Sequence, residues 1–186
     1  RKIPFYYGWV ILFAAGDAMF VRNAAASLTL SVFVFPISDD LGWSRTMIAG
    51  AASLGGLVSA VASPIVGWVS DRYGVRLVLT ISVLALGIST FSLAWATVPI
   101  TFYLAFGMGR VLFSTSFQIG SSVAISQWFV RRRGRATGML FLSHSMGMVL
   151  FPLLAGMVIH SWGWQAAWMV LGAIVWIAAL APVSVL

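Results

Sequence analysis

Four ionisable side chains stand inside long apolar stretches of the sequence, and they are the residues with the chemistry to contact a polar ligand. They are Asp17, Arg22, Arg110 and His144. A charge near the centre of a bilayer costs at least about 2.5 kcal/mol, so such residues need a partner, water or a function. Arginine suits a carboxylate ligand, because its planar guanidinium donates two parallel hydrogen bonds.

A structural role remains open for each of these side chains. Asp17 and Arg22 are five residues apart, an offset of about 140° that disfavours a direct pair within one helix. Asp17 could instead pair with Arg110 across helices, and Arg22 could extend to the outer interface. His144 lies between two serines, which suits a hydrogen-bonded packing residue. Two amide side chains suit hydrogen bonds between helices, namely Asn23 and Gln118.

The composition indicates the environment that must position these residues. Of 186 residues, 61% are hydrophobic and 8% are charged, and the mean hydropathy is +1.00. A soluble domain of this size cannot bury so much apolar surface, which predicts a polytopic membrane protein. The net charge of +7 is spread over short loops, so we expect no nucleic-acid partner. The sequence has no cysteine and no recognisable catalytic motif, and we expect neither an enzyme nor a metal or cofactor site.

A helix needs roughly 20 apolar residues to cross a bilayer. Charges, prolines and Gly-Trp turns divide the chain into six predicted spans, which form one all-α bundle over residues 1–186. The spans cover residues 6–35, 45–70, 75–96, 100–129, 136–160 and 164–186. Eight of the eleven basic residues fall at the N-terminus or in the second-to-third and fourth-to-fifth loops, which predicts that both termini are cytoplasmic. The chain begins without Met, and we expect it to belong to a longer protein.

Helical rise gives an expected depth for the polar residues. At 1.5 Å per residue, Arg22 lies about 24 Å and His144 about 12 Å from the cytoplasmic face. An internal repeat is also readable, because Gly67 and Gly156 align at an offset of 89 residues, and Arg22 and Arg110 at 88. This predicts two inverted three-helix repeats, as in many secondary transporters. Coincidence in a glycine-rich sequence is the alternative.

The loop from Gly67 to Arg76 resembles the cytoplasmic loop signature of the major facilitator superfamily, Gly-x-Leu-x-Asp-Arg-x-Gly-Arg-Arg. The matching residues are Gly67, Asp71, Arg72, Gly74 and Arg76. Valine replaces the signature Leu at position 69 and the first Arg of the closing pair at position 75. Residues 128–138 are similar to a loop of the monocarboxylate and oxalate/formate branch of this superfamily. The resemblance covers essentially the whole chain as the N-terminal half of a twelve-helix transporter, which implies a missing C-terminal six-helix half.

The resemblance implies a function and a location for the site. In this superfamily the first and fourth spans line a central cavity, so Asp17, Arg22, Arg110 and His144 would share a water-accessible site. Its net charge of about +1, or +2 with His144 protonated, favours an anion. We therefore expect secondary active transport of a small mono- or dicarboxylate across the plasma (inner) membrane, by uniport, proton symport or exchange. In the signature loop, the resemblance implies that Asp71 and its neighbouring arginines hold the cytoplasmic side shut.

One departure from the family and two alternatives bear on this expectation. Arg110 matches an Arg-x-x-Gln-Gly pattern of proton-coupled members, but Phe113 and Ser114 replace Gln and Gly, so a role in proton coupling stays open. A carrier of another solute class, such as a sugar or a drug, would share the same fold. A structural or assembly subunit that does not transport is the other alternative.

Overall fold

The computed structural model describes residues 8–117 and 133–184, and within these ranges every regular element is a helix. Two of the elements, η1 and η2, are short 3₁₀ turns. In chain order the elements are α1 (Gly8–Val21), η1 (Arg22–Ala25), α2 (Ser27–Leu41), α3 (Arg45–Tyr73), α4 (Val75–Ser92), η2 (Leu93–Trp95), α5 (Pro99–Ser114) and α7 (Arg133–Ser184). Helix α7 is interrupted at Gly163, where φ is 84° and ψ is 171°, so it consists of two helices that meet at this glycine.

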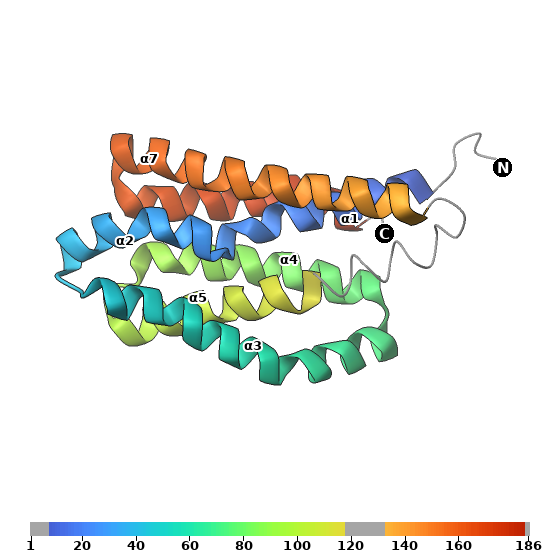
Figure 1. Cartoon of the computed structure of the whole chain (residues 1–186), viewed down its shortest axis with the longest axis horizontal. Helices are drawn as coiled ribbons and strands as arrows, with labels where there is room; N and C mark the ends of the chain where they lie inside the picture. Colours follow the sequence, from blue (N-terminus) through green and yellow to red (C-terminus); the bar gives the residue numbers. More distant parts are fainter. Residues whose placement is uncertain (1–7, 118–132, 185–186) are drawn as a thin grey trace.

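The helices lie side by side along the long axis of the molecule (Figure 1). At one end α1 begins, α3 meets α4, and α7 both begins and ends. At the other end lie the turn from α2 to α3, the connection from α4 to α5, and the Gly163 break. The signature residues at the end of α3 and the acidic pair Asp39 and Asp40 at the end of α2 are therefore at opposite ends of the bundle.

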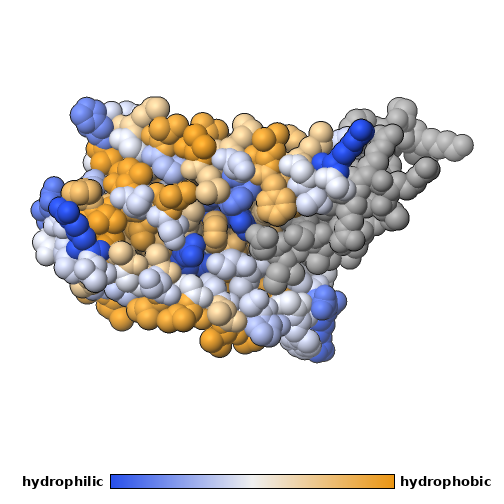
Figure 2. All heavy atoms as spheres, in the orientation of Figure 1, coloured by the Kyte–Doolittle hydropathy of each residue, from blue (hydrophilic) through white to orange (hydrophobic). Residues whose placement is uncertain are grey.

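Four described segments are long and apolar enough to cross a membrane. They are Gly8–Leu41, Arg45–Tyr73, Leu77–Trp95 and Gly134–Ala178. Helix α5 has 16 residues, and residues 118–132 lie outside the described part. Large apolar side chains cover much of the outside (Figure 2), including Val61 and Ile177, which are 77% and 80% exposed. Such a surface suits lipid, and the chain is a multi-pass membrane protein.

The first predicted span differs from the structure in two ways. It is broken at Ala26, which has extended backbone angles (φ −73°, ψ 151°), and it continues through Pro36 to Leu41. At the break, the side-chain amide of Asn23 donates to the carbonyls of Met19 (3.2 Å) and Phe20 (3.1 Å), and the Thr29 hydroxyl donates to the Asn23 carbonyl (2.7 Å). Side chains thus satisfy backbone groups that an unbroken helix would pair internally.

Helix α7 is the element against which most of the bundle packs, since it contacts α1, α2 and α4, while α3 packs on α5. The fully buried rings of Phe33 and Trp168 stack with centroids 3.8 Å apart and join α2 to the second part of α7. At Gly87 of α4 a Cβ atom would collide with the Trp176 ring, so the missing side chain allows this close contact. This packing brings η1, α5 and α7 together around the break.

Candidate substrate-binding site

Arg22 lies in the helix break and is buried, with 5% of its surface exposed. Its Nη1 donates to the Phe113 carbonyl of α5 at 3.3 Å, and its Cζ lies 4.4 Å from the centroid of the Phe113 ring. The guanidinium is therefore held inside the bundle by a cation–π contact and a hydrogen bond. The alternative that Arg22 extends to the outer interface is wrong.

Arg110 approaches the same aromatic ring from α5. Its Cζ lies 4.9 Å from the Phe113 centroid, so the two guanidinium carbons are within about 10 Å of each other. A Cβ on Gly55 of α3 would lie 2.8 Å from the Arg110 Cβ, so this glycine leaves room for the arginine. Arg110 has no hydrogen bond to any other residue in the described ranges, and its Nε is buried. Two like charges at this separation in a low-dielectric interior favour the presence of an anion.

His144 of α7 is in contact with the break. Its Nε2 lies 3.4 Å from Nη2 of Arg22, and its Nδ1 lies 3.1 Å from Nδ2 of Asn23. Asn23 is fully buried and also donates to the His144 carbonyl at 3.2 Å. A Cβ on Gly147 would lie 2.5 Å from Asn23 Nδ2, so the glycine permits the close approach of α7 to η1. The predicted interhelical role of Asn23 is confirmed.

Counting residues along the predicted spans gives Arg22 and His144 different depths, and the structure brings their side chains into contact. The depth of each residue in the bilayer stays a prediction.

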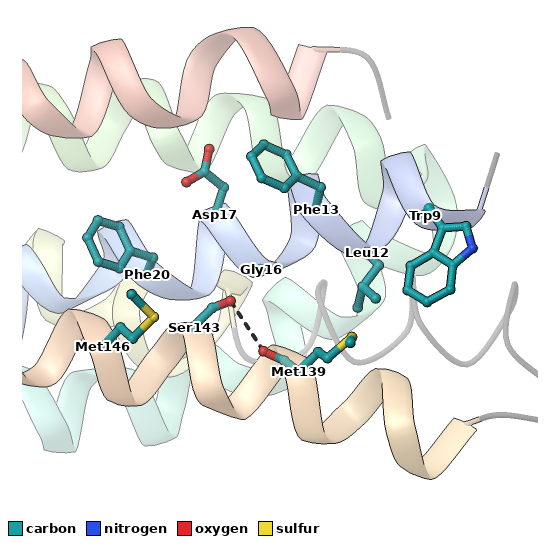
Figure 3. Close-up of a pocket in the computed structure, with 9 residues that line it drawn as sticks. All are labelled: Trp9, Leu12, Phe13, Gly16, Asp17, Phe20, Met139, Ser143 and Met146. Carbon is teal, nitrogen blue, oxygen red and sulfur yellow. Dashed lines mark hydrogen bonds between the residues drawn. The ribbon is translucent and has the colours of Figure 1, made fainter. Parts of the chain in front are cut away.

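Asp17 lies apart from this cluster. It faces a groove of about 430 Å³ between α1 and the first part of α7, and its carboxylate points away from Ser143 (Figure 3). The groove is lined by Trp9, Leu12, Phe13, Gly16, Asp17, Phe20, Met139, Ser143 and Met146. Asp17 makes no hydrogen bond or ion pair with the part of the chain that the structure describes. The alternative pair between Asp17 and Arg110 is therefore absent from these residues.

Most of the signature loop is helical, because Gly67, Asp71 and Arg72 lie in the last turns of α3 and Gly74 alone separates α3 from α4. Gly74 has φ of 86°, a conformation that glycine adopts without strain. Asp71 and Arg72 are exposed, and the Arg72 guanidinium lies 5.2 Å from the Trp68 ring centroid. A Cβ on Gly67 would meet nothing within 4 Å, so packing with described residues does not explain this glycine. The side chain of Arg76 and the residues of the second family loop up to position 132 lie outside the described part.

Two features of the site escape sequence reasoning. The first is Phe113, which departs from the family pattern and yet makes cation–π contacts with both Arg22 and Arg110. The second is the break itself, since residues 22–26 contain neither proline nor glycine. The signal that could have indicated the break is an Asn directly after an Arg in a long apolar run, at positions 22 and 23. Gln118 lies outside the described residues, and within them no three His, Cys, Asp or Glu side chains form a metal-binding group.

A polar contact at the far end of the bundle was also not predicted. The Trp164 indole Nε1 donates to Oδ2 of Asp40 at 2.9 Å, and the Gln165 amide donates to the same oxygen at 3.4 Å. Asp40 thereby joins the end of α2 to the start of the second helix of α7. It lies at the opposite end from the signature loop and does not belong to the arginine cluster.

Comparison with known proteins identifies relatives along the whole chain. It is 27% identical over 187 residues to an uncharacterised MFS-type transporter, YcxA, of Bacillus subtilis, covering 100% of this chain and 45% of that protein. It is 30% identical to the probable anion transporter 6, chloroplastic, of Arabidopsis thaliana, covering 92% of this chain and 33% of the relative. It is 27% identical to the monocarboxylate transporter 6 of Mus musculus, covering 90% of this chain and 36% of that transporter. The chain spans less than half the length of each of these relatives.

The match to a family model agrees with the loop signature and the helical architecture. The model is that of the Major Facilitator Superfamily, and it matches residues 12–186. It covers the helix break, the arginine cluster and the signature loop. The predicted resemblance is confirmed, and the chain belongs to the major facilitator superfamily of membrane transporters.

Proposed function

We propose that this chain is part of a secondary active transporter that moves a small organic anion, a mono- or dicarboxylate, by alternating access. The observation that carries the proposal is the convergence of Arg22 and Arg110, from η1 and α5, on the ring of Phe113. A carboxylate beside them would offset the cost of holding two positive charges in a low-dielectric interior. Each guanidinium can donate two parallel hydrogen bonds to such a ligand.

The distribution of acidic residues supports an anionic ligand. The sequence has four aspartates and no glutamate. Asp39 and Asp40 lie in the last turn of α2 at one end of the bundle, and Asp71 lies in the last turn of α3 at the other. Asp17 faces the groove between α1 and α7. The arginine cluster therefore lies in a region of net positive charge. The names of two relatives, an anion transporter and a monocarboxylate transporter, agree with this ligand class.

The proposed architecture comprises six spans arranged as two inverted three-helix repeats, with both termini on the cytoplasmic side of the plasma (inner) membrane. A further six-helix half would complete the transporter, as the greater length of the relatives suggests. The break in the first span supports a binding site at this level, because transporters form their sites from discontinuous helices. Asp71, with Arg72 and Arg76, would hold the cytoplasmic side shut against the second half.

The alternatives predict different sites. A sugar carrier needs neutral hydrogen-bonding groups and gains little from two neighbouring guanidiniums. A structural subunit needs no pair of guanidiniums beside the helix break. Hydrophilic residues interrupt the apolar face near its middle (Figure 2), which favours a path for a polar solute over a surface made only for lipid. Uniport, proton symport and exchange remain the possible modes.

The test is uptake of radiolabelled lactate and succinate by proteoliposomes that contain the full-length protein. Arg110→Ala should lower uptake at low substrate concentration about 10- to 100-fold, the range expected for a lost hydrogen bond to a charged group. Arg45→Ala is the matched control, because Arg45 is exposed at the far end of the bundle and the variant loses the same charge. Equal uptake by wild type and Arg110→Ala would refute the site, and uptake of neither carboxylate would refute the substrate class.

A further inference from the structure

We propose that a pocket lined by hydroxyl groups between α3 and α5 binds the part of the substrate beyond its carboxylate, and that this part carries a hydroxyl group. The substrate is then a hydroxylated monocarboxylate, whose carboxylate lies at Arg22 and Arg110. The inference rests on the proposed function and narrows its substrate class. It assigns Ser63 and Ser114 as residues that determine specificity.

The pocket has a volume of about 250 Å³ and lies between the middle of α3 and the end of α5. A cavity can hold a water molecule from about 10–15 Å³, so this one has room for a polar group of a ligand and its hydrogen-bond partners. Four of the six lining residues carry a hydroxyl group and none carries a charge. They are Gly56, Ser59, Ala60, Ser63, Ser114 and Thr115.

The pocket is adjacent to Arg110 on both helices that form it. In α5, Ser114 follows Arg110 by four residues, which places the two on one helix face about one turn, roughly 5–6 Å, apart. In α3, a Cβ on Gly55 would lie 2.8 Å from the Arg110 Cβ. The Ser59 hydroxyl donates to the Gly55 carbonyl at 2.6 Å. One helical turn is roughly the length of an extended four-carbon chain, so a ligand with its carboxylate at Arg110 would reach the pocket with its far end.

Two of the four hydroxyls have already used their hydrogen. The Ser59 hydroxyl donates to the Gly55 carbonyl, and the Thr115 hydroxyl donates to the Val111 carbonyl at 2.6 Å. Ser59 and Thr115 are 3% and 1% exposed, so both side chains are fixed by packing. Because a hydroxyl has one hydrogen, these two oxygens can only accept a hydrogen bond from a ligand.

The other two hydroxyls keep their hydrogen for a ligand. Ser63 and Ser114 make no hydrogen bond with any residue in the ranges 8–117 and 133–184. Serines in helices often donate to a carbonyl one turn earlier, as Ser143 does to Met139 at 3.2 Å. Ser114 also stands where the family pattern of proton-coupled members has Gly. The pocket therefore offers two groups that can donate and two that can only accept.

This set of groups matches a hydroxyl better than a carboxylate or a methyl group. A ligand hydroxyl can accept from Ser63 or Ser114 and donate to Ser59 or Thr115. A carboxylate only accepts, so its oxygens would face the two protein oxygens that also only accept, and no lining residue has a positive charge. A methyl group would displace water and leave the hydroxyls unpaired, which weakens binding.

Three ligands with the same four-carbon chain separate these cases, namely 4-hydroxybutyrate, butyrate and succinate. Their binding to the full-length protein in detergent would be measured by calorimetry. We expect the Kd of 4-hydroxybutyrate to be about tenfold lower than that of either other ligand, which is the effect of about one hydrogen bond. Butyrate or succinate binding as tightly as 4-hydroxybutyrate would overturn the inference.

The pocket itself is tested by variants that remove one hydroxyl. Ser114→Ala and Ser63→Ala, on different helices, should each raise the Kd of 4-hydroxybutyrate about 5- to 10-fold and that of butyrate less than twofold. Ser114→Thr keeps the hydroxyl and should stay close to the wild type. Ser31→Ala is the control, because it removes an exposed hydroxyl of α2 that bonds within its own helix, and it should change neither Kd.

The outcomes distinguish this inference from the proposed function. Equal increases in Kd for 4-hydroxybutyrate and butyrate in both alanine variants would show that the serines only stabilise the packing of α3 on α5, and would overturn the inference. So would an unchanged Kd in both variants. If the wild type binds none of the three ligands, the proposed function fails. If it binds butyrate or succinate without preferring 4-hydroxybutyrate, only the inference about the pocket fails.

Discussion

Gly147 provides the sharpest test of how the site is packed, because it is the position where α7 has no side chain opposite the helix break. A Cβ there would lie 2.5 Å from Asn23 Nδ2 and 2.5 Å from the Phe20 carbonyl oxygen. Ordinary contacts of a Cβ begin near 3.4 Å, so Gly147→Ala requires a shift of about 0.9 Å. One of the two atoms is backbone, and the other is held by three carbonyls, so neither can rotate away.

The expected cost follows from these contacts. Overpacking a tight site lowers the stability of the folded state by about 1–3 kcal/mol. Replacing glycine by alanine within a helix raises that stability by up to about 1 kcal/mol. We therefore expect Gly147→Ala to lower the free energy of unfolding by about 1–2 kcal/mol. Because the shift acts on Asn23 and through it on His144, carboxylate affinity should fall as well.

The assay is thermal unfolding of the detergent-solubilised full-length protein, with calorimetric binding of lactate and succinate. Gly156→Ala is the matched control in the same helix, because its Cβ would meet only a Val32 methyl at 3.8 Å. The control should keep or raise Tm and leave affinity unchanged. If Gly147→Ala unfolds at the same temperature as Gly156→Ala, the close approach of α7 to the break is refuted.

Two further predictions concern other contacts and use the same thermal unfolding assay. Asp40→Ala removes the acceptor of the Trp164 indole and should lower the free energy of unfolding by about 1–2 kcal/mol. Asp39→Ala is the control and should change the free energy of unfolding little, because Asp39 is exposed and makes no hydrogen bond to described residues. Similar Tm values for the two variants would contradict this. Thr29→Val removes the buried hydrogen bond to the Asn23 carbonyl and should lower the free energy of unfolding by about 1–3 kcal/mol. Thr29→Ser keeps the hydroxyl and should retain most of that stability. Equal losses in the two variants would show that the hydroxyl is not what stabilises the break.

Sequence reasoning identified three of the residues that the structure brings together, Arg22, Arg110 and His144, because a charged or titratable group in an apolar stretch stands out by its cost. It could not separate Asp17 from them. In the sequence, each of the four is an ionisable residue within an apolar stretch, and nothing distinguishes one from another. Which of them meet depends on how α1, α5 and α7 are rotated about their axes, and small differences in helix start and a single break change that rotation.

The sequence by itself determined the class of the protein. Its apolar composition requires lipid, its stretches of roughly 20 apolar residues require helices, and Gly74 with its neighbours marks the loop of a transporter family. Only the tertiary structure decided the site. The break at residues 22–26 occurs in an alanine-rich segment that favours helix, and Asn23 and Thr29 stabilise it by hydrogen-bonding the backbone groups that the break leaves unpaired. Asn23 can do so only because α7, more than 100 residues away in the chain, presents Gly147 and His144 to it.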